Sequence, residues 1–302
     1  MRIANVTKHS HIASGSTTEV PMENGSTSET RSDKVVLVTG ASSGLGRATA
    51  ALLVQRGYRV YGTSRQPAGD TGAGWPMLPL DVRSDRSVEA CVGELLSREG
   101  RIDALVNNAG YAFIGAVEET SLDEARAQLE TNFFGALRMM LAVLPAMRSR
   151  GTGHIVNISS LSGAVAVPFL GAYAASKHAL EAMSEALAHE LRGTRIRVTL
   201  LQPDGMRTHI GFHHPQSERP EHIARRRRLV SLLERATREE GNDPDMLAHA
   251  VAQALEDGAP PLRIPIGEGA KKLIEARRTL PEAEYGKLLA SLLQVGVEQV
   301  SD

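Results

Sequence analysis

One stretch of the sequence, from 35 to 47, constrains the fold more than any other. It begins as an apolar run typical of a buried strand, and an alanine-rich helical pattern follows after a turn with three glycines. Glycine permits a tight turn and lets a phosphate approach the backbone, and the first N–H groups of the helix favour an anion there. A strand-to-helix turn without a ligand is the simpler alternative. We expect dinucleotide contacts from Gly40, Ser42, Ser43, Gly44, Leu45 and Gly46.

From Lys34 onward, strand-like and helix-like segments alternate. Runs rich in Val, Ile and Leu predict strands at 35–39, 58–63, 77–80, 103–107, 153–158, 196–201 and 262–266. Helical patterns occupy 45–56, 84–98, 122–148 and 173–191. The alternation predicts an α/β fold, a doubly wound parallel sheet (Rossmann fold) of about seven strands with helices on both faces. Ligands of such sheets bind at the carboxyl ends of the strands.

Composition divides the chain into a tail and one domain. Residues 1–33 are rich in Ser, Thr, Gly and Glu without periodicity, so we expect a flexible tail. Residues 34–302 are predicted to form a single domain, with a polar lid over the substrate around 209–246 and a helical extension around 270–296. The lid contains four consecutive arginines, at 225–228. An anion-binding run is one interpretation, but we favour a solvated helix face balanced by Glu234, Glu239 and Glu240.

The charge balance and the cysteine content exclude several classes of protein. The formal net charge of −1 and the pI near 6.8 provide no electrostatic reason to expect nucleic acid or an anionic membrane as a partner. The single cysteine, Cys91, excludes an internal disulfide and suits a reducing compartment, where we expect it to pack a helix. No apolar run reaches the roughly 18 residues of a transmembrane helix. We therefore expect a cytoplasmic protein.

Polar residues at the predicted strand ends indicate how a nucleotide would be bound. An acid about 20 residues past the glycine turn would bind the ribose hydroxyls of NAD. Here the strand ends in Ser64 and Arg65, and an arginine attracts the 2′-phosphate that distinguishes NADP. Asp81 is placed to accept a hydrogen bond from the adenine amino group beside the backbone of Val82, although alone it is more typical of a helix cap. A small, amide-containing turn completes this set: Asn108, Ala109 and Gly110.

The sequence Tyr173-Ala-Ala-Ser-Lys177 carries the expected chemistry. Tyr and Lys at i and i+4 share one helix face. A free tyrosine has a pKa of about 10, so a nearby ammonium and an oxidised nicotinamide would help it to exchange protons. Tyr173 would then serve as general acid or base at a carbonyl or alcohol. Ser160 ends the preceding strand and is placed to hydrogen-bond the substrate oxygen.

Together these motifs resemble the short-chain dehydrogenase/reductase family, in its branch with a Thr-Gly-x-x-x-Gly-x-Gly turn, and the resemblance covers about 34–208. It implies a catalytic tetrad of Asn132, Ser160, Tyr173 and Lys177. In the family pattern Asn132 would lie at a helix bend and hold a water in a proton relay to Lys177. Lys177 would also bind the nicotinamide ribose, next to Tyr173.

A loop after the sixth strand completes the resemblance. Family members have Pro-Gly-x-x-x-Thr there, and its backbone binds the nicotinamide carboxamide. The resemblance therefore implies cofactor contacts from Pro203, Met206 and Thr208. Asp204 replaces the first glycine of the pattern, which puts the path of the loop in question.

The motifs favour an NADP(H)-dependent oxidoreductase that interconverts a ketone or aldehyde and an alcohol, with NADP(H) preferred over NAD(H). The long segment 209–302 resembles that of family members acting on lipophilic alcohols, and we expect Phe169, Leu170 and the lid to line such a site. The family also implies a homodimer or homotetramer built on the helices at 122–148 and 173–191. A non-enzymatic NADP-binding redox sensor or regulator is the alternative function, and epimerisation or dehydration with retained cofactor is a third.

Overall fold

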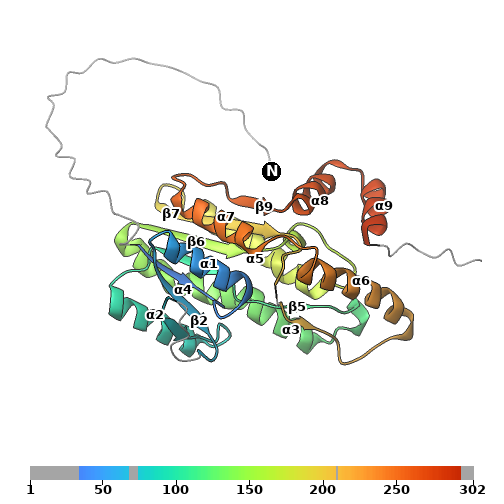
Figure 1. Ribbon diagram of the computed structural model, residues 1–302, viewed down its shortest axis with the longest axis horizontal. Coiled ribbons are helices and arrows are strands. Elements are labelled where there is room, and N and C mark those ends of the chain that lie inside the picture. Colours follow the sequence, from blue (N-terminus) through green and yellow to red (C-terminus); the bar gives the residue numbers. More distant parts are fainter. Residues whose placement is uncertain (1–33, 68–73, 209, 294–302) are drawn as a thin grey trace, which may run out of the picture.

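The computed structural model describes residues 34–67, 74–208 and 210–293. A seven-stranded, all-parallel sheet forms its centre, and the strands follow the spatial order β3-β2-β1-β4-β6-β7-β9 (Figure 1). The strand order reverses between β1 and β4, which is the position where doubly wound sheets bind their ligands. The strands are β1 Val35–Val38, β2 Arg59–Ser64, β3 Met77–Pro79, β4 Ala104–Asn107, β6 Thr152–Ile158, β7 Arg195–Pro203 and β9 Arg263–Ile266. All seven predicted strands are confirmed.

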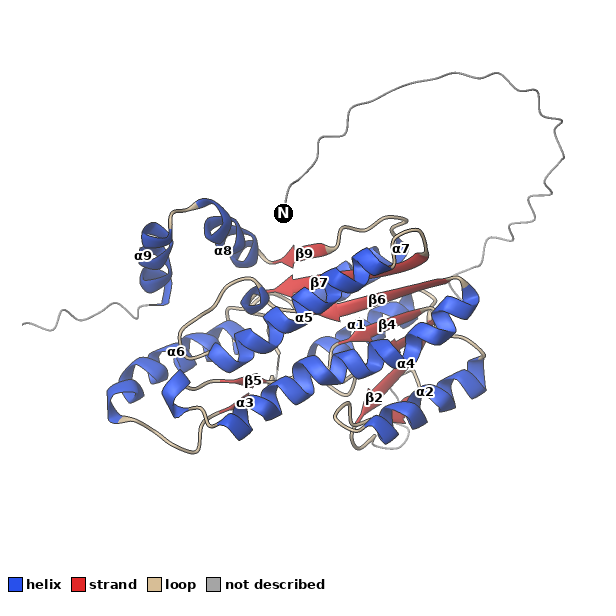
Figure 2. Cartoon of the chain, turned by 180° about the vertical axis from the view of Figure 1, so that it is seen from behind, coloured by secondary structure: helices blue, strands red, loops and turns tan. Residues whose placement is uncertain are grey.

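Helices cover both faces of the sheet (Figures 1 and 2). Along β1, Val35 and Leu37 pack on one face and Val36 and Val38 on the other, because successive strand residues alternate. The first face meets α2 Asp85–Glu99, α4 Gly135–Arg150 and α5 Gly171–Glu190. The second face meets α1 Gly44–Gln55 and α7 Pro244–Glu256. Both faces of the strands are covered by helices, which explains why the strand sequences are continuous apolar runs.

The four predicted helices are present, and the structure adds others. The helix expected at 122–148 is a continuous run of α3 Leu122–Leu129, a π-helical turn Glu130–Phe134, and α4. The sequence interpretation missed α7, although Asp243 caps it by accepting a hydrogen bond from the amide of Asp245 and Pro244 begins it. It also missed the two short strands β5 Ala112–Phe113 and β8 Phe212–His213, whose pairing joins distant parts of the chain. Cys91 is buried in the core on α2, as expected.

The predicted lid contains the long helix α6 Pro220–Arg238, and the interpretation of its arginine run is wrong in one respect. Arg226 is buried, and it pairs with the buried Glu119 and with Glu218 instead of facing solvent. The run is therefore partly a structural anchor. Two of the acids named in the sequence interpretation pair with other arginines, Glu240 with Arg235 and Glu234 with Arg238.

The C-terminal part of the chain contains two helices, α8 Glu268–Thr279 and α9 Glu282–Leu293, beyond the β9 edge of the sheet (Figure 1). They occupy most of the predicted extension, with a break at Leu280 and Pro281. The expected tail at 1–33 lies outside the described residues, as do 294–296 of the extension. Within the described ranges, no helix combines the length and apolar character needed to span a bilayer.

Candidate active site

The glycine turn after β1 has the geometry that only glycine adopts easily. Gly40 and Gly44 have positive φ angles of 67° and 53°. At Gly46 a Cβ atom would lie 2.5 Å from the Asn108 side-chain nitrogen and would overlap the carbonyl of Gly40. The turn therefore packs against the end of β4 so closely that a side chain at Gly46 would displace it.

Asn108 and Thr39 lock this turn in place. The side chain of Asn108 donates hydrogen bonds to the carbonyls of Thr39 at 2.9 Å and Gly40 at 3.2 Å. In return, Thr39 Oγ1 accepts the backbone N–H groups of Asn108 at 2.9 Å and Ala109 at 3.0 Å. Thr39 is buried, so these bonds are shielded from water. Asn108 thus supports the glycine turn and leaves the backbone of Ala109 and Gly110 beside the cleft.

A cleft of about 620 Å³ opens at the carboxyl ends of β1, β2 and β4. Most of the predicted cofactor contacts line it: Gly40, Ser42, Ser43, Gly44, Leu45, Ser64, Arg65, Asp81, Val82, Asn108, Ala109, Gly110 and Thr208. The others lie outside this lining, namely Gly46, which packs under the turn, and Tyr173, Lys177, Pro203 and Met206.

Several further residues line the cleft, and among them the sequence interpretation missed Arg83, Tyr111 and His213, whose side chains can contact a ligand. Arg83 follows Asp81 in the same loop, and Tyr111 directly follows Gly110. Their places next to predicted contact residues could therefore have indicated that they line the cleft. His213 reaches the cleft only because β8 pairs with β5, and its ring lies 4.5 Å from that of Tyr111, centroid to centroid.

At the end of β2, the cleft has a buried hydroxyl group without a hydrogen-bond partner and an exposed arginine. Ser64 Oγ is buried and has no hydrogen-bond partner within the protein, and Arg65 beside it is exposed at the cleft. A buried hydroxyl without a partner is costly, so a ligand oxygen would relieve it. Together with the open glycine turn, these groups fit the phosphates and ribose of a dinucleotide.

Asp81 is held by Arg83 rather than by a helix. The Arg83 guanidinium donates to both carboxylate oxygens, with Nη2 2.7 Å from Oδ2, and these bonds lower the pKa of Asp81 to about 2. The cap of α2 is Ser84, whose hydroxyl accepts the amide of Ser87. The alternative interpretation of Asp81 as the helix cap is therefore wrong.

Ser160, Tyr173 and Lys177 meet where β6 ends and α5 begins. Ser160 follows β6, and its hydroxyl accepts the amide of Ser162 at 3.0 Å and hydrogen-bonds Tyr173. Burial raises the pKa of the Tyr173 phenol above its ordinary value, and the Ser160 bond opposes this rise. The phenol therefore keeps its proton at neutral pH, as a proton donor must.

Lys177 is tied to the end of β6 by its ammonium group. Its Nζ donates to the carbonyl of Ile158 at 2.8 Å and lies 5.9 Å from the centroid of the Tyr173 ring. Burial lowers the pKa of Lys177 to about 8, with Glu181 opposing the shift. The ammonium is thus near the phenol and close to its own titration range.

Asn132 lies in the π-helical turn between α3 and α4 and is buried. Its side chain bonds both backbone groups of Tyr111, and its Nδ2 lies 3.3 Å from the Ser176 hydroxyl on α5. A π turn changes the helical hydrogen-bond pattern locally and is frequent at functional sites. Asn132 therefore connects the cleft to the helix that carries Tyr173 and Lys177.

The loop after β7 runs under the cleft. Thr208 lines it, whereas Met206 is buried and bridges to Asn242 through the backbone. Asp204, which interrupts the family pattern, directs its carboxylate to the start of α8 and away from the cleft. The loop keeps its tie to the sheet, because the Asp204 amide donates to Ile266 at 3.1 Å.

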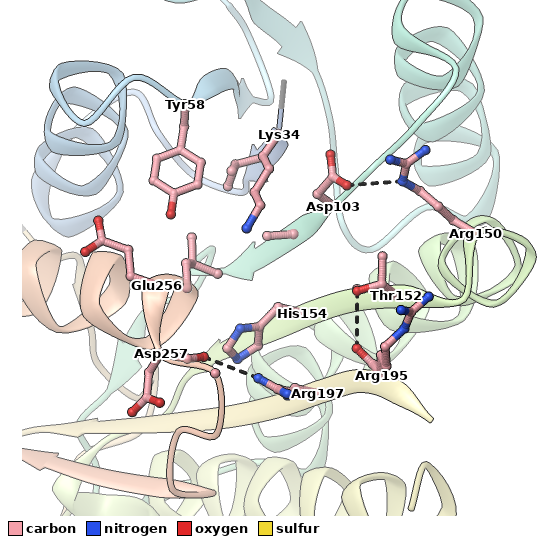
Figure 3. A pocket seen from close by; sticks show the side chains of 15 residues that line it. Lys34, Tyr58, Asp103, Arg150, Thr152, His154, Arg195, Arg197, Glu256 and Asp257 are labelled. Atoms are coloured by element: carbon pink, nitrogen blue, oxygen red, sulfur yellow. Dashed lines mark hydrogen bonds and ion pairs between the residues drawn. The ribbon is translucent and has the colours of Figure 1, made fainter. Parts of the chain in front are cut away.

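A second cavity, of about 690 Å³, lies at the opposite, amino ends of β1, β4, β6 and β7 (Figure 3). Its lining is charged, and two of its arginines contact the protein itself: Arg150 pairs with Asp103 at 3.4 Å, and Arg197 donates to the carbonyl of Asp257 at 3.3 Å. It contains none of the predicted site residues. We therefore place the candidate site in the smaller cleft, because ligands of parallel sheets bind at the carboxyl ends.

Comparison with known proteins decides the family. A family model described as short chain dehydrogenase matches residues 34–218. The chain belongs to the short-chain dehydrogenase/reductase family. As a member, it is an enzyme of the oxidoreductase class that uses a nicotinamide cofactor and a small-molecule substrate.

The similar proteins include a named reductase and solved short-chain dehydrogenases that carry either NADP or NAD. The chain is 39% identical to 3-ketodihydrosphingosine reductase of Bacteroides thetaiotaomicron, over 78% of this chain and 88% of that protein. A short-chain dehydrogenase of Burkholderia cenocepacia, solved with NADP, matches with a TM-score of 0.69 and 28% identity, covering 85% of this chain and 97% of the other. One of Burkholderia phymatum, solved with NAD, matches with a TM-score of 0.71 and 25% identity, covering 81% and 92%.

Proposed function

We propose that the protein reduces a lipophilic ketone with NADPH, and catalyses the reverse oxidation of the alcohol, using Tyr173 as the proton-transferring group. The observation that carries the proposal is the meeting of Ser160, Tyr173 and Lys177 at the strand ends, with a protonated phenol and a buried ammonium. A nicotinamide cofactor supplies the hydride when it is bound.

Each residue of the protein has a distinct part in this proposal. Ser160 donates a hydrogen bond to the substrate oxygen as negative charge develops on it. Tyr173 delivers its proton to that oxygen, which leaves a phenolate. The Lys177 ammonium stabilises this phenolate, and Asn132 supports the relay that returns the proton. In the direction of oxidation the same groups act in reverse.

The cofactor end of the cleft favours NADP(H). Arg65 is exposed at the cleft beside the unpaired hydroxyl of Ser64, and no acid takes the position where a carboxylate would bind the ribose of NAD. A guanidinium and a hydroxyl are complementary to a 2′-phosphate. Solved relatives carry either NADP or NAD, so the preference rests on these two residues.

An apolar cluster supports a lipophilic substrate. Buried Ile114, Phe169, Leu170 and Leu229 form its centre, and Tyr173 packs against it. The lid helix α6 contributes Leu229, and its buried Arg226–Glu119 pair holds it there. A substrate oxygen at Tyr173 would therefore have an apolar surface beside it. The similarity to a reductase named for a 3-keto sphingosine derivative agrees with this substrate class.

The proposed homodimer or homotetramer draws support from exposed apolar side chains on two helices. On the helical run from α3 to α4, Phe134 and Leu141 are 42% and 60% exposed, and Met183 on α5 is 37% exposed. A second copy of the chain would cover them.

The single domain from 34 to 302 and the cytoplasmic location stay predictions.

A substrate screen tests the proposed function. Purified protein is given NADPH and a panel of ketones that differ in chain length, and cofactor oxidation is followed by absorbance. We expect turnover that rises with the apolar size of the ketone and releases one NADP⁺ per product alcohol. Product formation without net cofactor change would point to epimerisation or dehydration, and cofactor binding without any turnover would point to a regulator.

A further inference from the structure

Asp204 is the residue that departs from the family pattern, and the structure gives it partners. It follows the last residue of β7, its Oδ2 accepts the amide of Ala270 at 2.9 Å, and its carboxylate also accepts the amide of Gly269. Both amides belong to the first turn of α8, which has no side-chain cap of its own at Gly267. Asp204 therefore serves as an acceptor from outside the helix, 66 residues earlier in the chain.

Two glycines make room for this carboxylate. Gly267 has a positive φ of 94°, and a Cβ atom there would overlap the carboxylate of Asp204. A Cβ atom at Gly269 would lie 2.7 Å from Asp204 Oδ2. Burial raises the pKa of Asp204, and the bonds from Ala270, Gly269 and Asn242 oppose that rise. The start of α8 is thus shaped around Asp204.

Asn242 joins the same arrangement from the segment between α6 and α7. Its side chain donates to the carboxylate of Asp204 and to the carbonyl of Gly205. Its backbone donates to the Gly205 carbonyl and accepts the amide of Arg207, both at 2.8 Å. The loop that carries Met206 and Thr208 is therefore bound on one side by Asn242 and, through Asp204, on the other by α8.

The helices that Asp204 holds reach the apolar cluster. Leu293, at the end of α9, packs against the cluster that includes Phe169 and Leu229, and Tyr173 packs against the same cluster. Tyr285 of α9 is buried, and the Arg277 guanidinium of α8 lies 5.1 Å from its ring centroid and pairs with Glu282, so α8 and α9 pack against each other. A chain of contacts therefore connects Asp204 to Leu293 through α8 and α9.

We propose that Asp204 is a positioning residue that fixes α8 and α9 against the loop after β7, so that Leu293 closes the apolar end of the substrate site and the enzyme selects large lipophilic substrates. This inference rests on the proposed function, since it names what sets the substrate size at the same site. Asp204 is not among the residues that line the cleft, and its carboxylate bonds the start of α8, so it would act through α8 and α9.

The test compares Asp204→Gly, which restores the family residue, with the wild-type chain by two readouts. Hydrogen exchange of the amides of 268–293 is expected to accelerate by about tenfold, since α8 loses two of its end contacts. The KM of a long-chain ketone is expected to rise by about tenfold, the effect of losing one buried apolar contact, whereas kcat for a small ketone stays unchanged. Asp204→Asn keeps one acceptor oxygen and should give smaller changes of the same kind.

Two further variants separate the possible causes. Glu268→Gln removes a charge from the same end of α8 without touching the loop, and should leave exchange and KM unchanged. Leu293→Ala should raise the KM of the long-chain ketone without changing exchange near Asp204. Equal losses for large and small ketones, or unchanged exchange in Asp204→Gly, would overturn the proposal. If the wild-type chain reduces no ketone at all, the proposed function fails, while the exchange result still decides whether Asp204 positions α8.

Discussion

The ammonium of Lys177 lies 5.9 Å from the centre of the Tyr173 ring, one helical turn further along α5, and is fastened to the carbonyl of Ile158. Their pKa values are shifted in opposite directions. Burial raises the pKa of Tyr173 and lowers that of Lys177 to about 8. Of the two, Lys177 titrates first as the pH rises, and this ordering makes the pair testable.

Kcat/KM for ketone reduction should be constant at neutral pH and fall above a pH of about 8. The proposed mechanism needs the Lys177 ammonium, which loses its proton as the pH rises through that pKa, whereas the raised pKa keeps Tyr173 protonated. Loss of one proton lowers kcat/KM by about tenfold per pH unit. A pH profile of kcat/KM at saturating NADPH checks this. The same limb persisting in Lys177→Met would contradict the assignment.

Tyr173→Phe should lower kcat by about 10²- to 10⁴-fold, the usual contribution of a positioned general acid. The substitution removes only the phenol oxygen, so the variant should fold and still saturate with NADPH. Steady-state kinetics measure the loss. Tyr61→Phe is a matched control, because Tyr61 bonds Glu99 on the α2 side of the sheet, outside the cleft. Unchanged turnover in Tyr173→Phe would remove the mechanism.

Arg65→Asp should raise the KM of NADPH by about 10- to 100-fold, since a charge-assisted hydrogen bond contributes about 1.5–3 kcal/mol. The KM of NADH should change little or fall, because an acid at this position suits a free ribose. Initial rates with the two cofactors, measured on one preparation, provide the comparison. Equal effects on both would show that Arg65 does not contact the 2′-phosphate.

The buried pair of Arg226 and Glu119 should matter for stability. Burial alone would raise the pKa of Glu119, but hydrogen bonds from Arg219 and Arg226 outweigh it and hold the pKa below its usual value. Arg226→Met leaves this carboxylate without its cation, so the free energy of unfolding should fall by about 3 kcal/mol.

Denaturant unfolding measures the change, with the exposed neighbour as control: Arg227→Met should shift the free energy of unfolding by less than about 0.5 kcal/mol. Adding Glu119→Gln to Arg226→Met should recover part of the loss, since it removes the unpaired charge. Equal losses in Arg226→Met and Arg227→Met would mean that the buried pair does not anchor α6.

The sequence alone determined the sheet and the glycine turn. All seven strands were visible because each is an apolar run covered on both faces, and the turn was visible because Gly40, Gly44 and Gly46 are needed for local geometry. Tyr173 and Lys177 are four residues apart on one helix, so their proximity also follows from local structure. Such features depend on neighbours in the chain, and a pattern of residues records them.

Only the tertiary structure decided which distant groups meet. Arg226 pairs with Glu119, which lies 107 residues away in the sequence, and Asp204 bonds the start of α8, 66 residues away. No sequence pattern predicts either partner. The same holds for His213, which reaches the cleft through the pairing of β8 with β5. From the sequence alone, a charged residue is predicted to be solvent-exposed. Its burial and its partner depend on how the whole chain packs and not on the local sequence.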